Sequence, residues 1–183
     1  MNKLDLIILF GGRSSEHEVS CRSAFAVINN LDREKYNVIP VGITKDGRWY
    51  QYTGRTERIA DGTWLTNREN LYPVTPDIAA QTHLFHTIRG ASLWTLPCDL
   101  VFPVLHGAEG EDGRIQGMLD VARIPYVGCG CAASAVSMDK ALTKSIINGT
   151  GVPQVPCLIV RADEDPAAVA ARVEEKFTYP VFV

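Results

Sequence analysis

The sequence predicts an α/β fold with an open parallel sheet, because the pattern strand, helix, strand occurs twice. An apolar run at residues 6–10 is followed by a helical pattern and by a second apolar run from Tyr36. The same order recurs between residues 99 and 130. Continuous apolar runs of strand length are typical of strands covered on both faces. Each repeat therefore predicts a parallel βαβ unit with a right-handed crossover.

The first unit has readable element boundaries. The helix is expected to begin at Ser15, with Glu18 three residues later completing a capping box. An aspartate–glycine turn in "KDGRWYQY" is expected to return the second strand on itself. The inward face of the helix is predicted to be Ala24, Val27, Ile28 and Leu31, which recur at helical spacing.

The second unit begins with a buried strand from Asp99 to Leu105 and ends with a short strand in "PYVGCG". Between them lie a polar loop at residues 106–113 and a helix with its own apolar face, Ile115, Met118, Leu119 and Ala122. Functional loops in open sheets lie beyond the carboxyl ends of the strands. The loops Gly11–Glu18 and His106–Gly113 are therefore expected on the same rim.

Residues 54–96 show no single period, and we expect an irregular segment with a short helix and an edge hairpin. His83 and His86 could ligate a metal if they lay on a helix, although surface or packing roles are the commoner fate of such a pair.

From Ser134 the pattern predicts a helix closed by Gly149 and Gly151, with Val136, Ala141, Ile146 and Ile147 inward. A strand "VPCLIV", a helix from Pro166 and a strand "YPVFV" are expected to follow. We expect a domain boundary between residues 135 and 136. Because the chain stops at Val183 inside a predicted strand, we expect the sequence to be part of a longer protein.

The composition is that of a globular protein, with 46% hydrophobic and 21% charged residues. A net charge of −3 without a long basic run gives no reason to expect nucleic acid as a partner. No apolar stretch approaches the ~20 residues that cross a bilayer, so a soluble protein without a membrane partner is expected. The five cysteines lack a CxxC pair, which favours reduced thiols in a cytoplasm, with Cys129 and Cys131 as small buried thiols rather than metal ligands.

The rim residues allow more than one interpretation. The turn "GGRSSE" lacks the third glycine of a dinucleotide fingerprint, which disfavours an oxidoreductase. Glu16 and Glu18 could complement the helix dipole, or one of them could bind a cationic ligand group. His106 could be a loop histidine bonded to backbone or a functional group at the end of a buried strand. The glycines at 107, 110 and 113 would let backbone N–H groups approach an anion.

Together these stretches resemble the D-alanine–D-alanine ligases. The resemblance rests on "GGRSSEHEVS", "ITKDGRWY", "DLVFPVLHGAEGEDGRIQGMLD", "IPYVGCGCAASAVSMDK" and "TYPVFV". It spans nearly the whole chain apart from residues 54–96. The long connection before "DLVFPVLHG" is similar to the branch that includes vancomycin-resistance ligases of the D-alanine–D-serine type.

The resemblance implies a Rossmann-like, pre-ATP-grasp sheet followed by the start of an ATP-grasp domain. It implies that ATP phosphorylates the carboxylate of a first D-alanine, and that the amine of a second D-amino acid attacks the acyl phosphate. By position, Glu16 would hold the ammonium of the first D-alanine and Val19 would pack against its methyl group. His106 would orient the second substrate and the transferring phosphoryl group beside Gly107, and Lys140 would contact the ATP phosphates.

The same resemblance implies Mg²⁺ with ligands beyond residue 183, none of them within this sequence. It also implies a homodimer, a cytoplasmic location and a role in peptidoglycan precursor synthesis. A chain of 183 residues without those ligands is expected to be inactive alone. The competing hypothesis is a non-catalytic α/β domain that binds a small molecule, with acids that only cap a helix.

Overall fold

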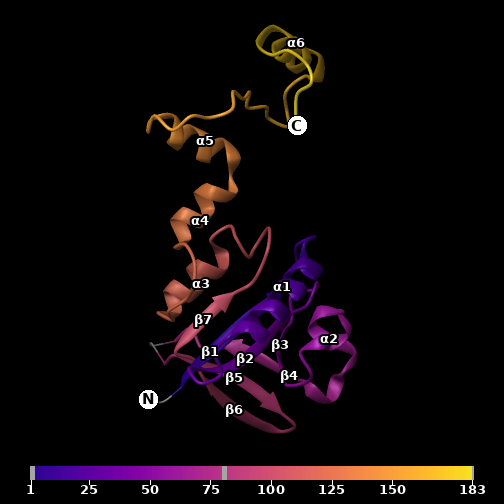
Figure 1. Ribbon diagram of the computed structural model, residues 1–183, viewed down its shortest axis with the longest axis vertical. Helices are drawn as coiled ribbons and strands as arrows, with labels where there is room; N and C mark the ends of the chain where they lie inside the picture. Colours follow the sequence, from indigo (N-terminus) through magenta and orange to yellow (C-terminus); the bar gives the residue numbers. More distant parts are fainter. Residues whose placement is uncertain (1–2, 80–81, 183) are drawn as a thin grey trace. The chain divides into compact units, whose positions relative to one another are not determined.

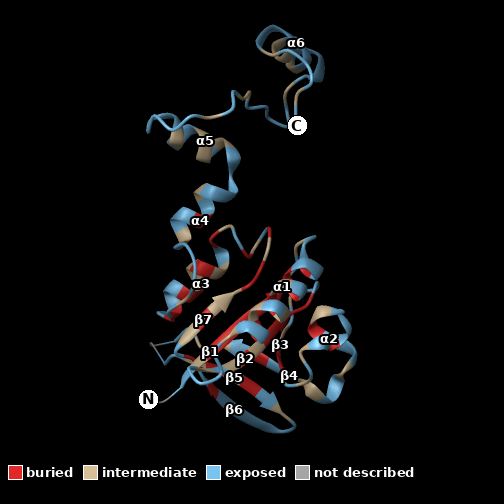
Figure 2. Cartoon of the chain, viewed as in Figure 1, coloured by how far each residue is buried: buried red, intermediate tan, exposed pale blue. Residues whose placement is uncertain are grey.

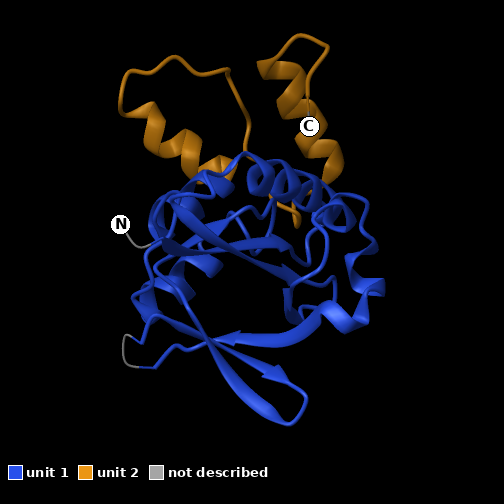
Figure 3. Cartoon of the chain, turned by 60° about the horizontal axis from the view of Figure 1, so that its bottom comes forward, with its two compact units in different colours: residues 1–138 blue, residues 139–183 orange. Residues whose placement is uncertain are grey.

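The structure is a computed structural model that describes residues 3–79 and 82–182, and it divides into two compact units, Met1–Met138 and Asp139–Val183 (Figures 1 and 3). The division at 135/136 stays a prediction.

Seven strands of the first unit form one sheet in the order β6-β5-β4-β3-β2-β1-β7. The strands are β1 (Leu4–Gly11), β2 (Tyr36–Ile43), β3 (Trp49–Tyr52), β4 (Leu71–Pro76), β5 (Leu84–Arg89), β6 (Ser92–Pro97) and β7 (Leu100–Pro103). The helices of this unit are α1 (His17–Asn30), α2 (Glu57–Ala60), α3 (Arg114–Ala122) and α4 (Cys131–Met138), with 3-10 turns η1 (Thr63–Thr66) and η2 (Arg68–Asn70).

The α/β fold class is confirmed, but the sheet is mixed rather than wholly parallel. β1 pairs in parallel with β2 on one side and with β7 on the other, as both βαβ patterns predict. From β2 outward to β6 each pair is antiparallel, beginning with the hairpin that turns at Asp46–Gly47. "PYVGCG" contributes only a single parallel bridge between Tyr126 and Val101.

Alternating side chains of β1 fill two cores, one on each face of the sheet. Leu6, Ile8 and Phe10 pack with Cys21, Ala24 and Ile28 of α1, which confirms the inward face of that helix. Ile7 and Leu9 pack with Leu119 and Ala122 of α3. α1 and α3 therefore cover opposite faces, and the buried residues lie along the sheet between them (Figure 2).

Residues 54–96 are more regular than the sequence suggests. The short helix and the edge hairpin are present as α2 and β5–β6, but β4 was not predicted. Trp64 is fully buried against Phe10, with ring centroids 5.0 Å apart in an edge-to-face arrangement, and this aromatic pair fixes the segment on the α1 side of the sheet.

His83 and His86 do not lie on a helix, so the condition under which they could have formed a metal pair is not met. His86 lies on β5, with its Nε2 3.1 Å from Asp77 Oδ2, and His83 precedes that strand. Within residues 3–79 and 82–182, no group of three or more His, Cys, Asp or Glu side chains could hold a metal ion.

The second unit contains α5 (Lys140–Asn148) and α6 (Pro166–Lys176), each capped by the aspartate before it. The single helix predicted from Ser134 is wrong, because Asp139 adopts extended backbone and its carboxylate accepts the amides of Ala141 and Leu142. The strands predicted in "VPCLIV" and "YPVFV" are not formed in residues 155–160 and 179–182; Val183 lies outside the described residues. A strand needs a neighbouring strand to pair with, whereas here the ammonium groups of Lys144 and Lys176 bind the carbonyls of Val155 and Cys157.

Candidate functional site

The order of the strands reverses at β1, and both polar loops follow strands at that point. The crossover from β1 leads through α1 to β2, while β7 lies on the opposite side of β1 and leads into α3. In open α/β sheets, ligands bind outside the carboxyl ends of the strands where the order reverses. The loops at residues 12–16 and 104–113 meet there, as the sequence predicts.

A serine joins the two loops through their backbones. The Ser14 hydroxyl donates to the carbonyl of His106 at 2.7 Å and accepts the amide of Glu16 at 3.1 Å. The capping box predicted at Ser15 and Glu18 is therefore wrong. α1 begins at His17, and no side chain caps it from the N-cap residue Glu16. The structure thus has a hydrogen bond from Ser14 to the second loop, and it lacks the expected side-chain cap on the first turn of α1.

Ser20 fixes α1 against the ends of both parallel strands. Its buried hydroxyl accepts the amide of Gly11 at 2.8 Å and donates to the carbonyl of Val104. One turn earlier, His17 Nδ1 lies 2.7 Å from the carbonyl of Gly12. The first turns of α1 are therefore fixed relative to the loops, which is what a preorganised binding site requires.

The two glutamates at the start of α1 differ in their partners. Glu18 forms an ion pair with Lys45, and the hydrogen bond from the Lys45 ammonium lowers the pKa of this carboxyl. Glu16 is exposed and has no ion pair within the described part of the chain. Its carboxylate lies close to Gly107: a Cβ placed on that glycine would be 2.4 Å from Glu16 Oε2. Of the two acids, Glu16 is the one available to a cationic ligand.

Val19 and His106 belong to the two segments that adjoin this carboxylate, the start of α1 and the loop that contains Gly107. Val19 follows Glu16 by three residues on α1, so the two share a face, and Val19 is 42% exposed. His106 is half-buried, and its Nε2 lies 3.0 Å from Ser23 Oγ. The structure therefore brings together Glu16, His106 and Gly107, with Val19 beside Glu16.

The second loop is held by its own acids. The amide of Gly107 donates to Glu111 Oε2 at 2.6 Å, and Asp112 accepts the amides of Glu109 and Arg114. Gly107 is buried with a φ of +73°, where a side chain would be strained and would meet Glu16. The backbone conformation at this position therefore favours glycine, and the Glu16 carboxylate occupies the space that a side chain would enter.

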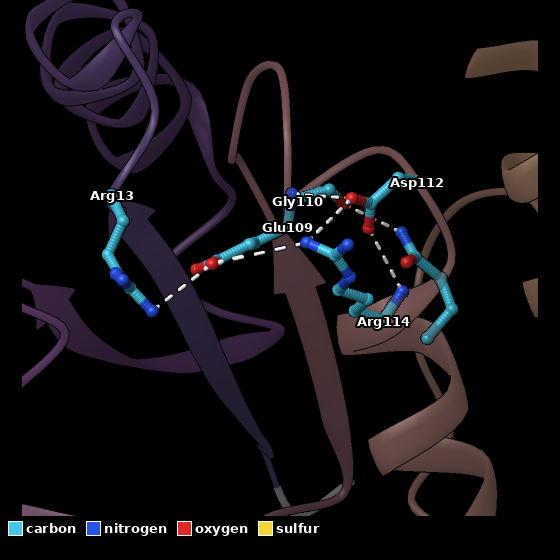
Figure 4. A network of polar contacts seen from close by, with 6 residues as sticks. Arg13, Glu109, Gly110, Asp112 and Arg114 are labelled. Carbon is cyan, nitrogen blue, oxygen red and sulfur yellow. Dashed lines mark hydrogen bonds and ion pairs between the residues drawn. The ribbon is translucent and has the colours of Figure 1, made fainter. Parts of the chain in front are cut away.

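An ion pair also crosses the rim. The Glu109 carboxylate lies 3.2 Å from the Arg13 guanidinium of the first loop. Arg114 lies near both Glu109 and Asp112 (Figure 4). Beneath these side chains is a cavity of about 240 Å³, lined by Arg13, His106, Glu109 and Trp49 among others. Glu16 is not among its lining residues, so the Glu16–Gly107 contact and this cavity are neighbouring features of one rim.

Lys140 belongs to the second unit. It is exposed and is the first residue of α5, directly after the capping Asp139. An ammonium group at a helix N-terminus suits an anionic ligand such as phosphate, since backbone N–H groups and the helix dipole favour negative charge there.

The cysteines differ in part from expectation. The structure describes all five as free thiols, with Cys21 and Cys98 buried. Cys129 is exposed and Cys131 is half-buried, so their prediction as buried thiols is wrong. The glycines at 128 and 130 have almost no atoms packed near their Cβ positions, in keeping with the exposure of Cys129 between them.

Comparison with known proteins decides the family. A family model described as the D-ala D-ala ligase N-terminus matches residues 5–129. The chain belongs to this family. It is 44% identical over 186 residues to a D-alanine–D-alanine ligase of Caldicellulosiruptor bescii, covering 100% of this chain and 50% of that protein. The chain spans about half the length of the curated relatives it matches.

Solved structures agree with the family assignment and with the fold. The VanG D-Ala:D-Ser ligase from Enterococcus faecalis matches with a TM-score of 0.84 and 38% identity over 98% of this chain and 51% of that one. The D-alanine–D-alanine ligase from Coxiella burnetii matches with a TM-score of 0.85 and 32% identity, over 97% and 50% of the two chains.

Sequence reasoning missed the residues that hold the rim loops of this chain in place, namely Arg13, Ser14, Ser20, Ser23, Glu109, Glu111 and Asp112. A serine in a polar loop has many possible partners, so its type and spacing do not identify one. The acids Glu111 and Asp112 lie within a stretch that carries the family resemblance, but the hydrogen bonds they accept from backbone amides become visible only in the folded loop.

Proposed function

We propose that this chain is the N-terminal part of an ATP-dependent ligase that joins D-alanine to a second D-amino acid, D-alanine or D-serine. The observation that carries the proposal is the position of Glu16. Its carboxylate is exposed at the switch point of the sheet beside Gly107, while the neighbouring Glu18 is paired with Lys45. An ammonium group is the ligand chemistry that an accessible carboxylate at this rim favours.

In the proposed reaction, the carboxylate of the first D-alanine attacks the γ-phosphorus of ATP, and ADP leaves. The amine of the second D-amino acid then attacks the acyl carbon, loses a proton, and displaces inorganic phosphate as the peptide bond forms. Glu16 holds the ammonium of the first D-alanine, and Val19 packs against its methyl group. His106, with Gly107, orients the second substrate and the phosphoryl group.

Lys140 is proposed to contact the phosphates of ATP, where its charge offsets the negative charge of the transferring group. Mg²⁺ is proposed to bind with ligands outside these residues and to supply charge stabilisation to phosphoryl transfer. Residues 1–183 alone are proposed to be inactive.

The biological setting follows from the proposed reaction. A D-alanyl dipeptide is a building block of peptidoglycan, and we place the enzyme in the cytoplasm as a homodimer. No helix in residues 3–79 and 82–182 is long and apolar enough to cross a membrane. Light scattering of the whole protein at high concentration tests the dimer, and a monomer mass would contradict it. The match to the VanG ligase supports a branch of the family that includes vancomycin-resistance enzymes.

The decisive experiment is ATP turnover by the whole protein with D-alanine alone and with D-alanine plus D-serine. Release of phosphate together with a dipeptide is expected, and the dipeptide identifies the second substrate. Folded, ATP-binding protein that releases no phosphate in response to any D-amino acid would contradict the proposal and favour a non-catalytic binding domain.

A further inference from the structure

A serine on α1 lies against the imidazole of His106. Ser23 follows Glu16 by seven residues and Val19 by four, so the three side chains share one face of the helix. The Ser23 hydroxyl is 3.0 Å from Nε2 of His106. Both residues are half-buried, so the contact is partly shielded from competing water.

His106 is held at two points: its backbone by the neighbouring loop and its ring by α1. Its carbonyl accepts the hydroxyl of Ser14 at 2.7 Å, which places its backbone, and Ser23 engages its ring. The helix that carries Ser23 is itself fixed, because Ser20 binds the Gly11 amide and the Val104 carbonyl. The Ser23 hydroxyl is thus a preorganised partner rather than a mobile one.

Because Ser23 lies at hydrogen-bond distance from one nitrogen of the His106 imidazole, the other nitrogen is the one left to bind a ligand. Within the described part of the chain, Nδ1 of His106 has no hydrogen-bond partner, while Nε2 faces Ser23. The partner of one imidazole nitrogen sets the orientation and proton position of the ring. Nδ1 is therefore the ring nitrogen that remains free to hydrogen-bond to a ligand.

We propose that Ser23 is a positioning residue that orients the His106 imidazole so that Nδ1 faces the second substrate. This inference rests on the proposed ligase function. It assigns Ser23 no contact with substrate. The role of the hydroxyl is to limit the rotation of a ring whose placement matters, since a misplacement of ~1 Å at a reacting centre can cost ~10²-fold in rate.

The test uses the whole protein with variants Ser23→Ala, Ser23→Cys and Ser23→Thr. Cysteine has the branching of serine with a larger sulfur atom and is a weak donor, so it fills the space beside the ring while weakening the hydrogen bond. Threonine keeps the hydroxyl. Ser92→Ala on β6 is the matched control, because that residue is an exposed serine away from the rim loops. Thermal unfolding of each variant establishes that it is folded.

We expect Ser23→Ala and Ser23→Cys to lower kcat/KM for the second D-amino acid ~10-fold or more. KM for the first D-alanine is expected to stay near the wild-type value. Ser23→Thr is expected to recover most of the loss, and Ser92→Ala to match the wild type. Full activity of folded Ser23→Ala and Ser23→Cys, alongside an impaired His106→Ala, would overturn the inference and leave the proposed function intact.

A double-mutant cycle separates positioning from a merely structural role. If Ser23 acts through His106, His106→Ala combined with Ser23→Ala is expected to be no slower than His106→Ala alone. Losses that multiply would overturn the inference, since Ser23 would then act independently of the ring. Full activity of His106→Ala itself would contradict the role proposed for His106, which is a different failure.

Discussion

At the residue scale, two glutamates separated by one histidine have unequal surroundings at the start of α1. Glu18 is neutralised by Lys45, while Glu16 lies against Gly107 with its carboxylate exposed. The sequence identifies both acids as candidates but does not distinguish them, because Lys45 reaches α1 only once β2 has paired beside β1.

Glu16→Gln in the whole protein is expected to raise KM for the first D-alanine about 10-fold or more. A tenfold change corresponds to a loss of ~1.4 kcal/mol of binding free energy. The amide keeps the shape of the side chain but removes the charge that faces the ammonium. Glu18→Gln is the matched control, with a much smaller change expected because its partner is Lys45. Equal KM values for the two variants in steady-state assays would contradict the assignment.

Ser20→Ala is expected to destabilise the fold by about 1–3 kcal/mol, because it leaves the buried amide of Gly11 and carbonyl of Val104 without their shared partner. Urea unfolding followed by circular dichroism measures the loss. Ser15→Ala, which changes an exposed serine of the same loop, is expected to have little effect. A Ser20→Ala protein as stable as the wild type would show that this hydroxyl does not fix the helix.

At the element scale, the turn between β1 and α1 depends on a close backbone approach. Gly11 has a φ of +85°, and a Cβ there would lie 2.3 Å from the carbonyl oxygen of Ile43 on β2. The chain therefore needs glycine for conformation and for space. The glycine pair is readable from the sequence as a turn, but the strand it touches is not.

The variants Gly11→Ala and Gly62→Ala separate the requirement for a positive φ from the requirement for space. Gly62 has a similar φ of +77° but open space around its Cβ position, so alanine there should cost ~1 kcal/mol of strain. Gly11→Ala is expected to cost clearly more, because β1 and β2 must move apart as well. Chemical denaturation of both variants gives the comparison, and equal losses would mean that the clash relaxes without cost.

The parallel elements of this fold were predictable because each βαβ unit is local in sequence. The βαβ patterns gave β1, α1, β2, β7 and α3, and the rule for loops beyond parallel strands gave the meeting of residues 12–16 with 104–113. β4 was missed because Leu71–Pro76 contains two prolines and takes its place only by pairing with β3 and β5. The strands predicted after residue 154 failed for the complementary reason, since an apolar run becomes a strand only beside another strand.

At the scale of the whole molecule, the first unit contains both hydrophobic cores. All residues of the two clusters lie between Leu6 and Ile124, inside the unit that ends at Met138. A chain with its own core can fold alone. Residues 1–138 are therefore expected to unfold cooperatively when heated, as followed by circular dichroism. A gradual, non-cooperative loss of signal would show that residues 139–183 are needed for folding.

Alkaline pH is expected to destabilise the fold through two buried thiols. Burial raises the pKa of Cys21 to about 11 and that of Cys98 to about 12, from an ordinary value of about 9. The folded chain retains these protons where the unfolded chain releases them. The stability that the thiols contribute is present below pH ~9 and declines as pH rises toward the raised values.

Unfolding free energies at pH 8.5 and 10.5 measure this decline. The double variant Cys21→Ala with Cys98→Ala is expected to lose less stability over that interval than the wild type does. Cys129→Ala is the control, because that thiol is exposed. Identical declines in the wild type and the double variant would contradict the prediction.

The three tryptophans of the chain occupy three different environments, and this gives the protein its own optical probes. Trp64 is fully buried, Trp94 is 55% exposed on β6, and Trp49 lines the cavity beneath Arg13 and Glu109. The three indole rings should therefore differ in emission wavelength and in their accessibility to a dissolved quencher. A small molecule that enters the rim cavity would change the light from Trp49 while Trp64 continues to report the integrity of the fold. Occupancy and unfolding can thus be followed separately, without attaching a dye.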